Sequence, residues 1–371
     1  MRELINIISE NNLQAESQKA YVSVGSITHR YCPMKKVDYM DTVLIQSLKG
    51  KKSSEGLKAL LKSAKMMHWM DQLNSKNKVI IKPNLCYIAP WESGVTTNVK
   101  LVEYLVNYLR GQNLNLKIFI VESDSNDRKC EDAFMQLGYM DLKEKYNVEL
   151  LNLTKQPYQD IVFPDLHYSI KIPEIFFEDV FFISIANLKV HSYQKMTCIC
   201  KNQFGCVPDE IKERYHQYME ETLYTLNKCI YPDLSIIDGK IGLEGIGPVT
   251  GTPVRTDIIL MSDNPIAIDT IAAKIMGLDP LEVPHLKYAY RKEGTKPEGY
   301  QVVGMKNIPR FKFHTDGSFK LIRSKINLTR FTDSLNKILK RSAEKIYNFP
   351  RFIRRAYGFG KRKLKAMVGK G

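Results

Sequence analysis

The sequence has no run of about 18 uncharged apolar residues, the length that a helix needs to cross a membrane. Its first residues, MRELINIISENN, are too polar for the apolar region of a secretory signal peptide. The 7 cysteines are odd in number and irregularly spaced, a pattern that does not indicate a disulfide framework. These absences predict a cytoplasmic protein in a reducing compartment, without a membrane-spanning helix.

Standard nucleotide-binding motifs are absent as well. The glycine-rich segment 236–253, IIDGKIGLEGIGPVTGTP, lacks the G-x-x-x-x-G-K-[ST] spacing of a P-loop, and no G-x-G-x-x-G stands between a strand and a helix. The glycines still permit close backbone approach, so the segment could direct N–H groups toward a phosphate or a carboxylate. It is a candidate anion-binding loop that carries no standard NAD or P-loop signature.

Acidic residues are scarce in one region only. Residues 306–371 contain 19 Lys and Arg against three acidic residues, a net charge of +16, whereas residues 1–305 contain 36 basic and 37 acidic residues. The basicity therefore belongs to the tail and not to the main body. No recognised nucleic-acid-binding module accompanies it, so the sequence does not predict a nucleic-acid partner.

The main body, residues 1–305, alternates strand and helix patterns. Continuous apolar runs of β-formers predict buried strands at 79–85, 116–123, 148–153, 180–188, 234–239 and 256–262. Apolar residues at helical spacing predict helices at 99–110, 130–138 and 266–277. This alternation predicts an α/β fold with a mixed, largely parallel sheet flanked by helices.

The basic extension, residues 306–371, has a different pattern. Residues 328–346 keep apolar side chains at helical spacing, and residues 349–365 interleave aromatic residues with Arg and Lys. A basic amphipathic helix followed by such a segment suits an anionic membrane surface, with peripheral attachment to the inner membrane face through residues 320–371. A helix packed on the main body, followed by a basic end, is the alternative.

Polar clusters follow the first two predicted strands. Lys82 and Asn84 come after the first, and a loop then leads to residues 93–97, which place Gly and hydroxyl side chains at a helix start. Those residues suit either an anion site or simple N-capping. Glu122 ends the second strand, as a substrate contact or as part of a turn. Sites in open α/β sheets collect at the carboxyl ends of strands, because loops from several strands converge there.

The segment 187–208, NLKVHSYQKMTCICKNQFGCVP, contains three cysteines in C-x-C-x5-C spacing, which raises the question of a metal site. Cys198 and Cys200 are interpreted as small apolar residues of a packed segment. Cys206 remains a candidate ligand. The lysines of the segment indicate instead a pocket for an anion.

Lys189 and His191 are two residues apart and share one face of an extended chain. Lys201 and Asn202 follow ten residues later. These four side chains are predicted to form one side of an anion-binding site.

Three further candidates lie downstream. His216 falls in a predicted helix, where a lone histidine is usually structural or faces solvent. Asp238 ends the fifth predicted strand, and Glu244 lies in the glycine-rich segment. All three suit a site at strand ends.

The order KPNL, GVTT, LKVH, KNQFGCVP, a downstream His, IIDGKIGLEGIGPVTG and SDNPIAIDTIAAKIMGLDP resembles the domain of unknown function 362 family, over residues 20–305. Many members carry an added ferredoxin-like iron–sulfur segment with C-x2-C-x2-C-x3-C spacing, which is absent here. The family is largely uncharacterised. At matching positions the resemblance implies a site drawn from Lys82, Asn84, Thr97, Lys189, His191, Lys201, Asn202, Gly205, Cys206, His216, Asp238, Glu244, Gly245, Gly247 and Asp269.

The leading hypothesis is an enzyme acting on an anionic, carboxylate- or phosphate-bearing small molecule or lipid-linked headgroup. The catalytic candidates are His191 and His216 as acid–base groups, with Glu244 or Asp238 orienting them or binding a hydroxyl or cation. Isomerisation, group transfer and redox chemistry all stay open. The substrate-binding candidates are Lys82, Asn84, Thr97, Lys189, Lys201, Asn202, Gly245 and Gly247.

Two alternatives belong to other classes of protein. A divalent or transition metal, or a metallocofactor, could bind at ligands drawn from Cys206, His191, His216 and Glu244, although nearby lysines disfavour a cation. A non-catalytic, membrane-associated binding module is the second alternative, with the basic extension as its anchor.

Overall fold

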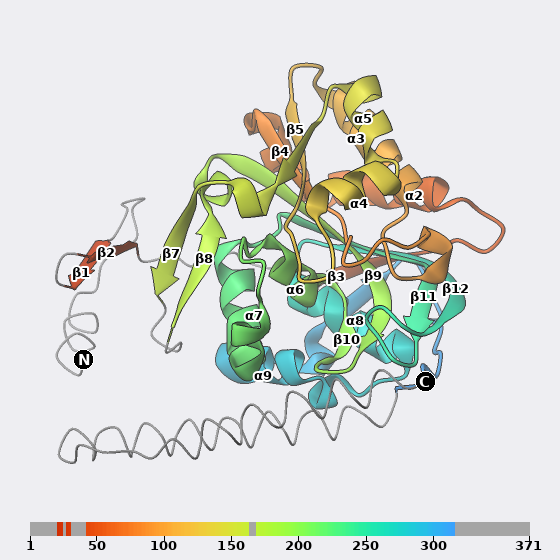
Figure 1. Ribbon diagram of the computed structural model, residues 1–371. Helices are drawn as coiled ribbons and strands as arrows, with labels where there is room; N and C mark the ends of the chain where they lie inside the picture. Colours follow the sequence, from red (N-terminus) through yellow and green to blue (C-terminus); the bar gives the residue numbers. More distant parts are fainter. Residues whose placement is uncertain (1–20, 25–26, 31–41, 163–167, 316–371) are drawn as a thin grey trace, which may run out of the picture. The chain divides into compact units, whose positions relative to one another are not determined.

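The computed structural model describes residues 21–24, 27–30, 42–162 and 168–315 (Figure 1). The larger sheet has the order β13-β3-β12-β11-β9-β4-β5-β6, with β10 paired to β9, and the smaller has the order β1-β2-β7-β8. The larger sheet contains β3 (Thr42–Ser47), β4 (Lys78–Lys82), β5 (Lys117–Glu122), β6 (Glu149–Asn152), β9 (Val180–His191), β10 (Lys195–Thr197), β11 (Leu234–Glu244), β12 (Thr252–Ser262) and β13 (Gln301–Val303). The smaller contains β1 (Tyr21–Val24), β2 (Ile27–Arg30), β7 (Tyr158–Val162) and β8 (Ser169–Pro173).

The strands β11, β9, β4, β5 and β6 are parallel, whereas β12 pairs antiparallel with both β11 and β3. All six predicted strands and all three predicted helices are present. The sequence-based prediction of an α/β fold with a mixed, largely parallel sheet is therefore confirmed. Because the parallel strands run in one direction, their carboxyl ends lie along one edge of the sheet.

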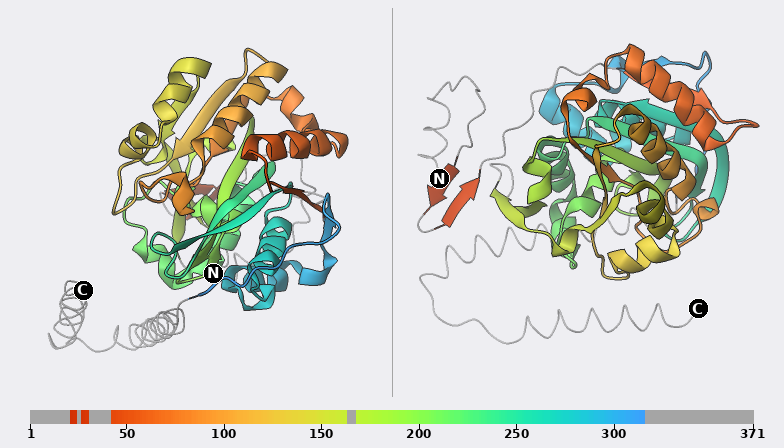
Figure 2. Two further views of the ribbon diagram at one scale, coloured as in Figure 1. Left: turned by 90° about the vertical axis from the view of Figure 1, so that its right-hand side faces the viewer. Right: turned by 90° about the horizontal axis from the view of Figure 1, so that it is seen from above.

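Helices cover both faces of this sheet, as Figures 1 and 2 show. The alternation along β4 illustrates why: Val79 and Ile81 pack into the core under one set of helices, and Ile80 packs into a core on the other face. One set comprises α2 (Ser53–Met66), α3 (Val99–Gln112), α4 (Cys130–Gln136) and α5 (Tyr139–Tyr146). The other comprises α6 (Ile199–Asn202), α7 (Met219–Cys229), α8 (Pro265–Met276) and α9 (Pro284–Glu293).

The strand β9 is a long central strand of the larger sheet, and it runs from the apolar core to the carboxyl ends of the parallel strands. Its side chains are buried from Phe181 to His191. Its last residues pair with β10 in an antiparallel hairpin, in which His191 lies opposite Lys195. The same strand therefore supplies apolar core residues at one end and polar side chains at the other.

The strand β11 is longer than the sequence indicated, because it continues from Asp238 to Glu244 through the glycine-rich segment. A Cβ atom at Gly242 would lie 2.8 Å from the carbonyl oxygen of Leu188 on β9. Glycine thus permits the close approach of two strands here, and part of the predicted loop is strand.

Residues beyond 305 still contact the folded body, since the N–H of Phe313 donates to the carbonyl of Met276 at 3.0 Å. The predicted helix at 328–346 and the proposed membrane segment 320–371 lie outside the described residues. Among the residues that are described, no helix is long and apolar enough to cross a membrane.

Candidate functional site

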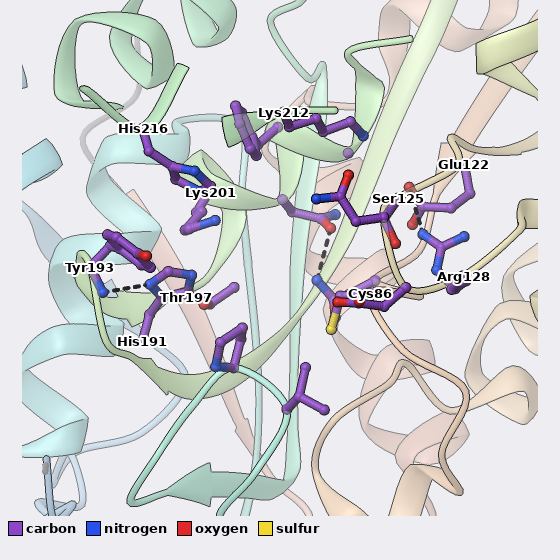
Figure 3. A pocket seen from close by; sticks show the side chains of 18 of the residues that line it. Cys86, Glu122, Ser125, Arg128, His191, Tyr193, Thr197, Lys201, Lys212 and His216 are labelled. Atoms are coloured by element: carbon purple, nitrogen blue, oxygen red, sulfur yellow. Dashed lines mark hydrogen bonds and ion pairs between the residues drawn. The ribbon is translucent and has the colours of Figure 1, made fainter. Parts of the chain in front are cut away.

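A cavity of about 410 Å³ opens at the carboxyl edge of the parallel strands. Figure 3 shows His191, Tyr193 and His216 toward one end of it, and Glu122, Ser125 and Arg128 toward the other. Side chains from strand ends, from α6 and from the segment after it form its lining. The lining is Lys82, Asn84, Cys86, Glu122, Ser125, Asn126, Asp127, Arg128, Lys189, His191, Ser192, Tyr193, Thr197, Lys201, Asn202, Phe204, Gly205, Glu210, Lys212, Glu213, His216, Pro248 and Val249.

A buried ion pair lies at the ends of β4 and β5. The Lys82 ammonium donates to Glu122 Oε2 at 2.8 Å, and the two side chains are 1% and 3% exposed. Burial alone would raise the pKa of the Glu122 carboxyl, but the charges of Lys82 and Arg128 hold it below its ordinary value. A Cβ atom at Gly205 would lie 2.8 Å from Lys82 Nζ, so glycine lets the backbone after α6 lie directly on the pair.

A second buried lysine lies at the end of β9. The Lys189 ammonium donates to Asn84 Oδ1 at 2.7 Å, to the carbonyl of Val95 at 2.8 Å and to Cys86 Sγ at 3.1 Å. Asn202 accepts from the Asn84 amide at 3.1 Å and so ties α6 to the end of β4. Lys189 therefore has its three ammonium protons directed at protein acceptors. We call Lys82, Glu122, Asn84, Lys189 and Asn202 the floor of the cavity.

Two further lysines, Lys201 on α6 and Lys212, form what we call the wall. Within the part of the chain that the structure describes, the Lys201 ammonium makes no hydrogen bond and lies 5.0 Å from the centre of the Phe204 ring. Lys212 donates to Ser123 Oγ at 2.5 Å. Burial above all, together with neighbouring cations, lowers the pKa of each lysine to about 8.

Arg128 adds a fifth cation to the lining. Its side chain is 3% exposed, and its nearest carboxylate contact is 3.7 Å, between Nη2 and Glu122 Oε1. Its Nε and Nη1 atoms are buried without a hydrogen-bond partner in the described residues. Buried guanidinium donors without partners are costly, because they lose their hydration and gain no acceptor.

The imidazole of His191 has a defined tautomer. Its Nδ1 accepts the backbone N–H of Tyr193 at 3.0 Å, so in the neutral ring Nε2 carries the proton. Burial, followed by the charge of Lys201, lowers the pKa of His191 well below its ordinary value. His191 is therefore neutral near pH 7 and acts as a hydrogen-bond donor through Nε2.

His216 stacks on Tyr193, with ring centres 4.9 Å apart and planes at 19°. Burial, followed by the charge of Lys201, lowers the pKa of His216 to about 4. The described residues supply no hydrogen-bond partner to its ring nitrogens. A neutral imidazole held by stacking alone can accept a proton from a molecule in the cavity.

The structure brings eight of the predicted site residues together in the cavity lining: Lys82, Asn84, Lys189, His191, Lys201, Asn202, Gly205 and His216. Seven others lie outside that lining: Thr97, Cys206, Asp238, Glu244, Gly245, Gly247 and Asp269. The glycine-rich segment reaches the cavity only through Pro248 and Val249.

Thr97 and Asp238 have structural contacts. Thr97 Oγ1 accepts the N–H of Asn84 at 2.8 Å. Asp238 is 2% exposed and binds Ser53 and Asn98, at the starts of α2 and α3, and burial raises its pKa to about 6. Helix α3 is capped by the side chain of Asn98, which accepts from Lys100 at 2.9 Å, so the segment before it serves N-capping.

Glu244 and its glycine neighbours also have protein partners. Glu244 Oε2 accepts the N–H of His314 at 2.8 Å, and the N–H of Gly245 donates to the carbonyl of the same residue at 2.7 Å. At Gly247 a Cβ atom would lie 2.0 Å from the carbonyl oxygen of Val190, which requires glycine. The N–H of Gly245 thus donates to the protein itself.

Cys206, the cysteine among the predicted metal ligands, lies outside the cavity lining. Cys206 is buried in an apolar core, and burial raises its pKa to about 12. Cys198 is buried among apolar residues, in line with its interpretation as a packing residue, whereas the thiol of Cys200, in the same core, lies near the carboxylate of Asp269. Cys229 is disulfide-bonded, which the odd cysteine count did not predict. The potential metal ligands that do gather within the described residues are Cys200, Asp269 and His285.

Among the lining residues that are not exposed, the sequence-based candidates missed three charged or reactive groups, Arg128, Lys212 and Cys86. Arg128 follows Glu122 by six residues, so its position after a strand end was an available signal. Lys212 stands at the start of a predicted helix among other charged residues, where nothing distinguishes it from a solvated lysine.

Three comparisons with known proteins bear on identity. A thylakoid-associated protein of Synechocystis sp. is 33% identical over 135 residues, which cover 34% of this chain and 42% of that protein. The match thus spans less than half of that relative. The lactate racemase apoprotein from Thermoanaerobacterium thermosaccharolyticum is 9% identical, with a TM-score of 0.39 over 70% of this chain and 63% of that one.

The third comparison, with protein families, matches a longer part of this chain than the Synechocystis relative does. The family described as "Domain of unknown function (DUF362)" matches residues 79–274, which is more than half of the sequence. The matched segment contains β5, β9, all of β4 except Lys78, and every cavity residue named above. The chain therefore belongs to the DUF362 family.

Proposed function

We propose that this protein is an enzyme that binds an anionic small molecule, bearing a carboxylate or a phosphate, in the cavity. One observation carries the proposal: Lys82, Arg128, Lys189, Lys201 and Lys212 line it, and Glu122 is the single buried carboxylate among the described lining residues. The acidic residues Asp127, Glu210 and Glu213 also border the cavity, but their side chains are exposed.

The cations with few protein partners support a position for the proposed anion. Lys82 and Lys189 already donate to protein acceptors, whereas Arg128 has two buried donors without partners in the described chain. An anion between Arg128, Lys201 and Lys212 would supply acceptors to these groups and offset their mutual repulsion. Carboxylates and phosphates are the groups that guanidinium and ammonium donors recognise best.

The two histidines supply the chemistry. His191 donates through Nε2 toward the part of the substrate that gains negative charge, and His216 accepts a proton. The pKa of His216, about 4, keeps that imidazole neutral at pH 7, and the negative charge of a bound anion would raise this pKa and make His216 a stronger base. Proton transfer next to a carboxylate or phosphate is the reaction type that this arrangement supports.

Titration calorimetry of the purified full-length chain with pyrophosphate and with citrate tests the anion site. We expect binding in the wild type and in the control Lys58→Met, which removes an exposed lysine of α2 away from the cavity, and weaker binding in Arg128→Met. Equal affinities in all three proteins, or binding of neither probe, would contradict the anion site.

Turnover is tested separately. The wild type is incubated with a deproteinised extract of anionic metabolites, and the compounds consumed and formed are identified by mass spectrometry. We expect a phosphate- or carboxylate-bearing compound to be consumed, and His191→Gln and His216→Gln to abolish this while retaining thermal stability. No difference between the wild type and heat-denatured protein would refute the enzyme hypothesis and leave anion binding intact.

A second proposal concerns residues 320–371, which we propose contact an anionic membrane surface. Their net positive charge supports this, as does the description of the Synechocystis relative as thylakoid-associated. The test is flotation of the full-length chain with vesicles rich in anionic lipid. We expect the charge reversal Arg354→Glu/Arg355→Glu/Lys361→Glu/Lys363→Glu to abolish flotation, and equal flotation of both proteins would overturn the proposal.

A further inference from the structure

A second cluster of reactive side chains lies behind the wall of the cavity, on three helices. Cys200 on α6, Asp269 on α8 and His285 on α9 are all buried. One atom of each, a sulfur, a carboxylate oxygen and a ring nitrogen, lies within 4.8 Å of the other two. The proposed anion site does not use these residues.

The hydrogen bonds around His285 define its tautomer. The Gln194 amide nitrogen donates to Glu220 Oε1 at 2.9 Å, which orients the amide and turns its oxygen toward His285. That oxygen lies 3.3 Å from His285 Nδ1, so Nδ1 carries the proton. The remaining nitrogen, Nε2, has a lone pair directed into the cluster.

His285 Nε2 is buried without a hydrogen-bond partner in the described residues. Its nearest charged neighbour is Asp269 Oδ2 at 3.8 Å, which is too far for a hydrogen bond. Two ligands about 2.1 Å from one tetrahedral ion would stand about 3.4 Å apart. The spacing is therefore closer to that of two ligands of one ion than to that of a direct contact.

The other two ligands are held in place. The Asp269 carboxylate accepts the N–H groups of Ile199 at 2.8 Å and Cys200 at 2.9 Å, and each oxygen keeps a further lone pair. Those bonds attach α8 to the first turn of α6, which carries Cys200 itself. The carboxylate and the thiol are thereby fixed next to each other before any ion binds.

A small cavity of about 20 Å³ adjoins the cluster and is lined by Cys200, Asn227 and His285 among others. It is large enough for one water molecule. Asn227 Oδ1 is buried there without a hydrogen-bond partner in the described chain. A water that binds an ion and donates to Asn227 would satisfy this oxygen.

We propose that Cys200 Sγ, Asp269 Oδ2 and His285 Nε2 bind one Zn²⁺ ion, with a water as the fourth ligand. A mixture of sulfur, nitrogen and oxygen ligands suits zinc among the common divalent ions. The thiolate and the carboxylate balance the charge of the ion. Gln194 is the outer hydrogen-bond partner that orients the histidine, as metal-bound histidines usually have.

The ion would act on the cavity through α6. Cys200 faces the cluster, whereas the next two residues, Lys201 and Asn202, line the cavity. Zinc would therefore fasten the single turn that carries them to α8 and α9. This is a positioning role, distinct from the chemistry of the histidines in the cavity.

The test uses the full-length chain, freed of metal with a chelator and then titrated with ZnCl₂ or CoCl₂. Elemental analysis should give one equivalent of zinc per chain, and the cobalt complex should show a thiolate-to-cobalt charge-transfer band. Cys200→Ser and His285→Gln should lose the stoichiometric zinc, and Cys200→Ser also the band. Gln194→Met should bind zinc about 10- to 100-fold more weakly.

The matched control is Cys198→Ala. This thiol is buried in the same core two residues away, and its sulfur contacts the carbonyl of Asn187 at 3.7 Å. It should keep both the stoichiometry and the charge-transfer band. The proposal is overturned if the wild type binds no stoichiometric zinc or if the band persists in Cys200→Ser. Equal losses in Cys198→Ala and Cys200→Ser would also overturn it.

Discussion

The floor and the wall of the cavity both contain buried or half-buried lysines, but these lysines differ in how many hydrogen-bond partners the protein gives them. On the floor, Lys82 and Lys189 each have protein acceptors for their protons. On the wall, Lys212 has one hydroxyl partner and Lys201 has none among the described residues. Charge and burial alone therefore do not distinguish a lysine whose ammonium group is fully hydrogen-bonded to the protein from one whose ammonium group has few protein partners.

The difference follows from the elements that carry these lysines. Lys82 is the last residue of β4, and Lys189 lies two residues before the end of β9; acceptors from the loop after β4, from the end of β5 and from α6 surround them. The wall lysines come from α6 and from the segment before α7, where fewer acceptors lie near them. The floor is thus expected to determine stability, and the wall to determine binding.

The largest effect is expected from breaking the floor. Glu122→Gln leaves Lys82 buried without its carboxylate and should lower the free energy of unfolding by about 3–5 kcal/mol, measured by urea denaturation. The control Glu103→Gln removes a carboxylate paired with Lys100 and Lys145 near the surface, for which about 1 kcal/mol or less is expected.

The double variant Lys82→Met/Glu122→Gln should recover part of the stability lost in Glu122→Gln, because no unpaired ammonium remains. If Glu122→Gln and Glu103→Gln were equally stable, the floor would not have the structural role assigned to it.

A smaller effect on stability is expected from the wall. Lys201→Met and Lys212→Met should change the free energy of unfolding by about 1 kcal/mol or less, since each removes a poorly paired cation. Each should weaken pyrophosphate binding about 10-fold or more, the contribution of one charge-assisted hydrogen bond. Calorimetry and urea denaturation of the same samples separate the two quantities, and a large loss of stability with unchanged affinity would reverse the assignment.

A pH dependence further distinguishes the two regions. The wall lysines have pKa values of about 8 when folded, below their ordinary value, so folding is penalised while both states are charged. Above pH 8 the folded state loses these protons first. Stability should therefore rise from pH 8 toward pH 10, relative to Lys201→Met/Lys212→Met. Parallel curves for the two proteins in urea denaturation would contradict these pKa shifts.

Most of what positions the site could be predicted from the sequence. Continuous apolar runs identified the parallel strands, and a shared sheet edge implied that Lys82, Lys189 and His191 would meet there. The outcome for His216 depends on tertiary packing, since its ring contacts Tyr193 and Phe204, which lie on other segments of the cavity lining.

Other positions could not be derived from strand ends alone. Asp238 follows the same pattern as the cavity residues, but its side chain binds the starts of two helices instead. Glu244 lies away from the cavity because β11 continues through the glycines as far as this residue. Arg128 and Lys212 lie on connecting segments, whose course depends on contacts that no local periodicity encodes.

The length of β9 has a consequence for exchange kinetics. Lys189 and His191 belong to the same strand as Phe181 and Ile183 in the core, paired with neighbours along its length. Their amide hydrogens should exchange with solvent only when the sheet itself opens. The segment of Lys212 lies outside the sheet, so its amides should exchange through local opening. If the protein adjusts to a bound molecule, the change is therefore expected in the segment that carries Lys212 and not in β9.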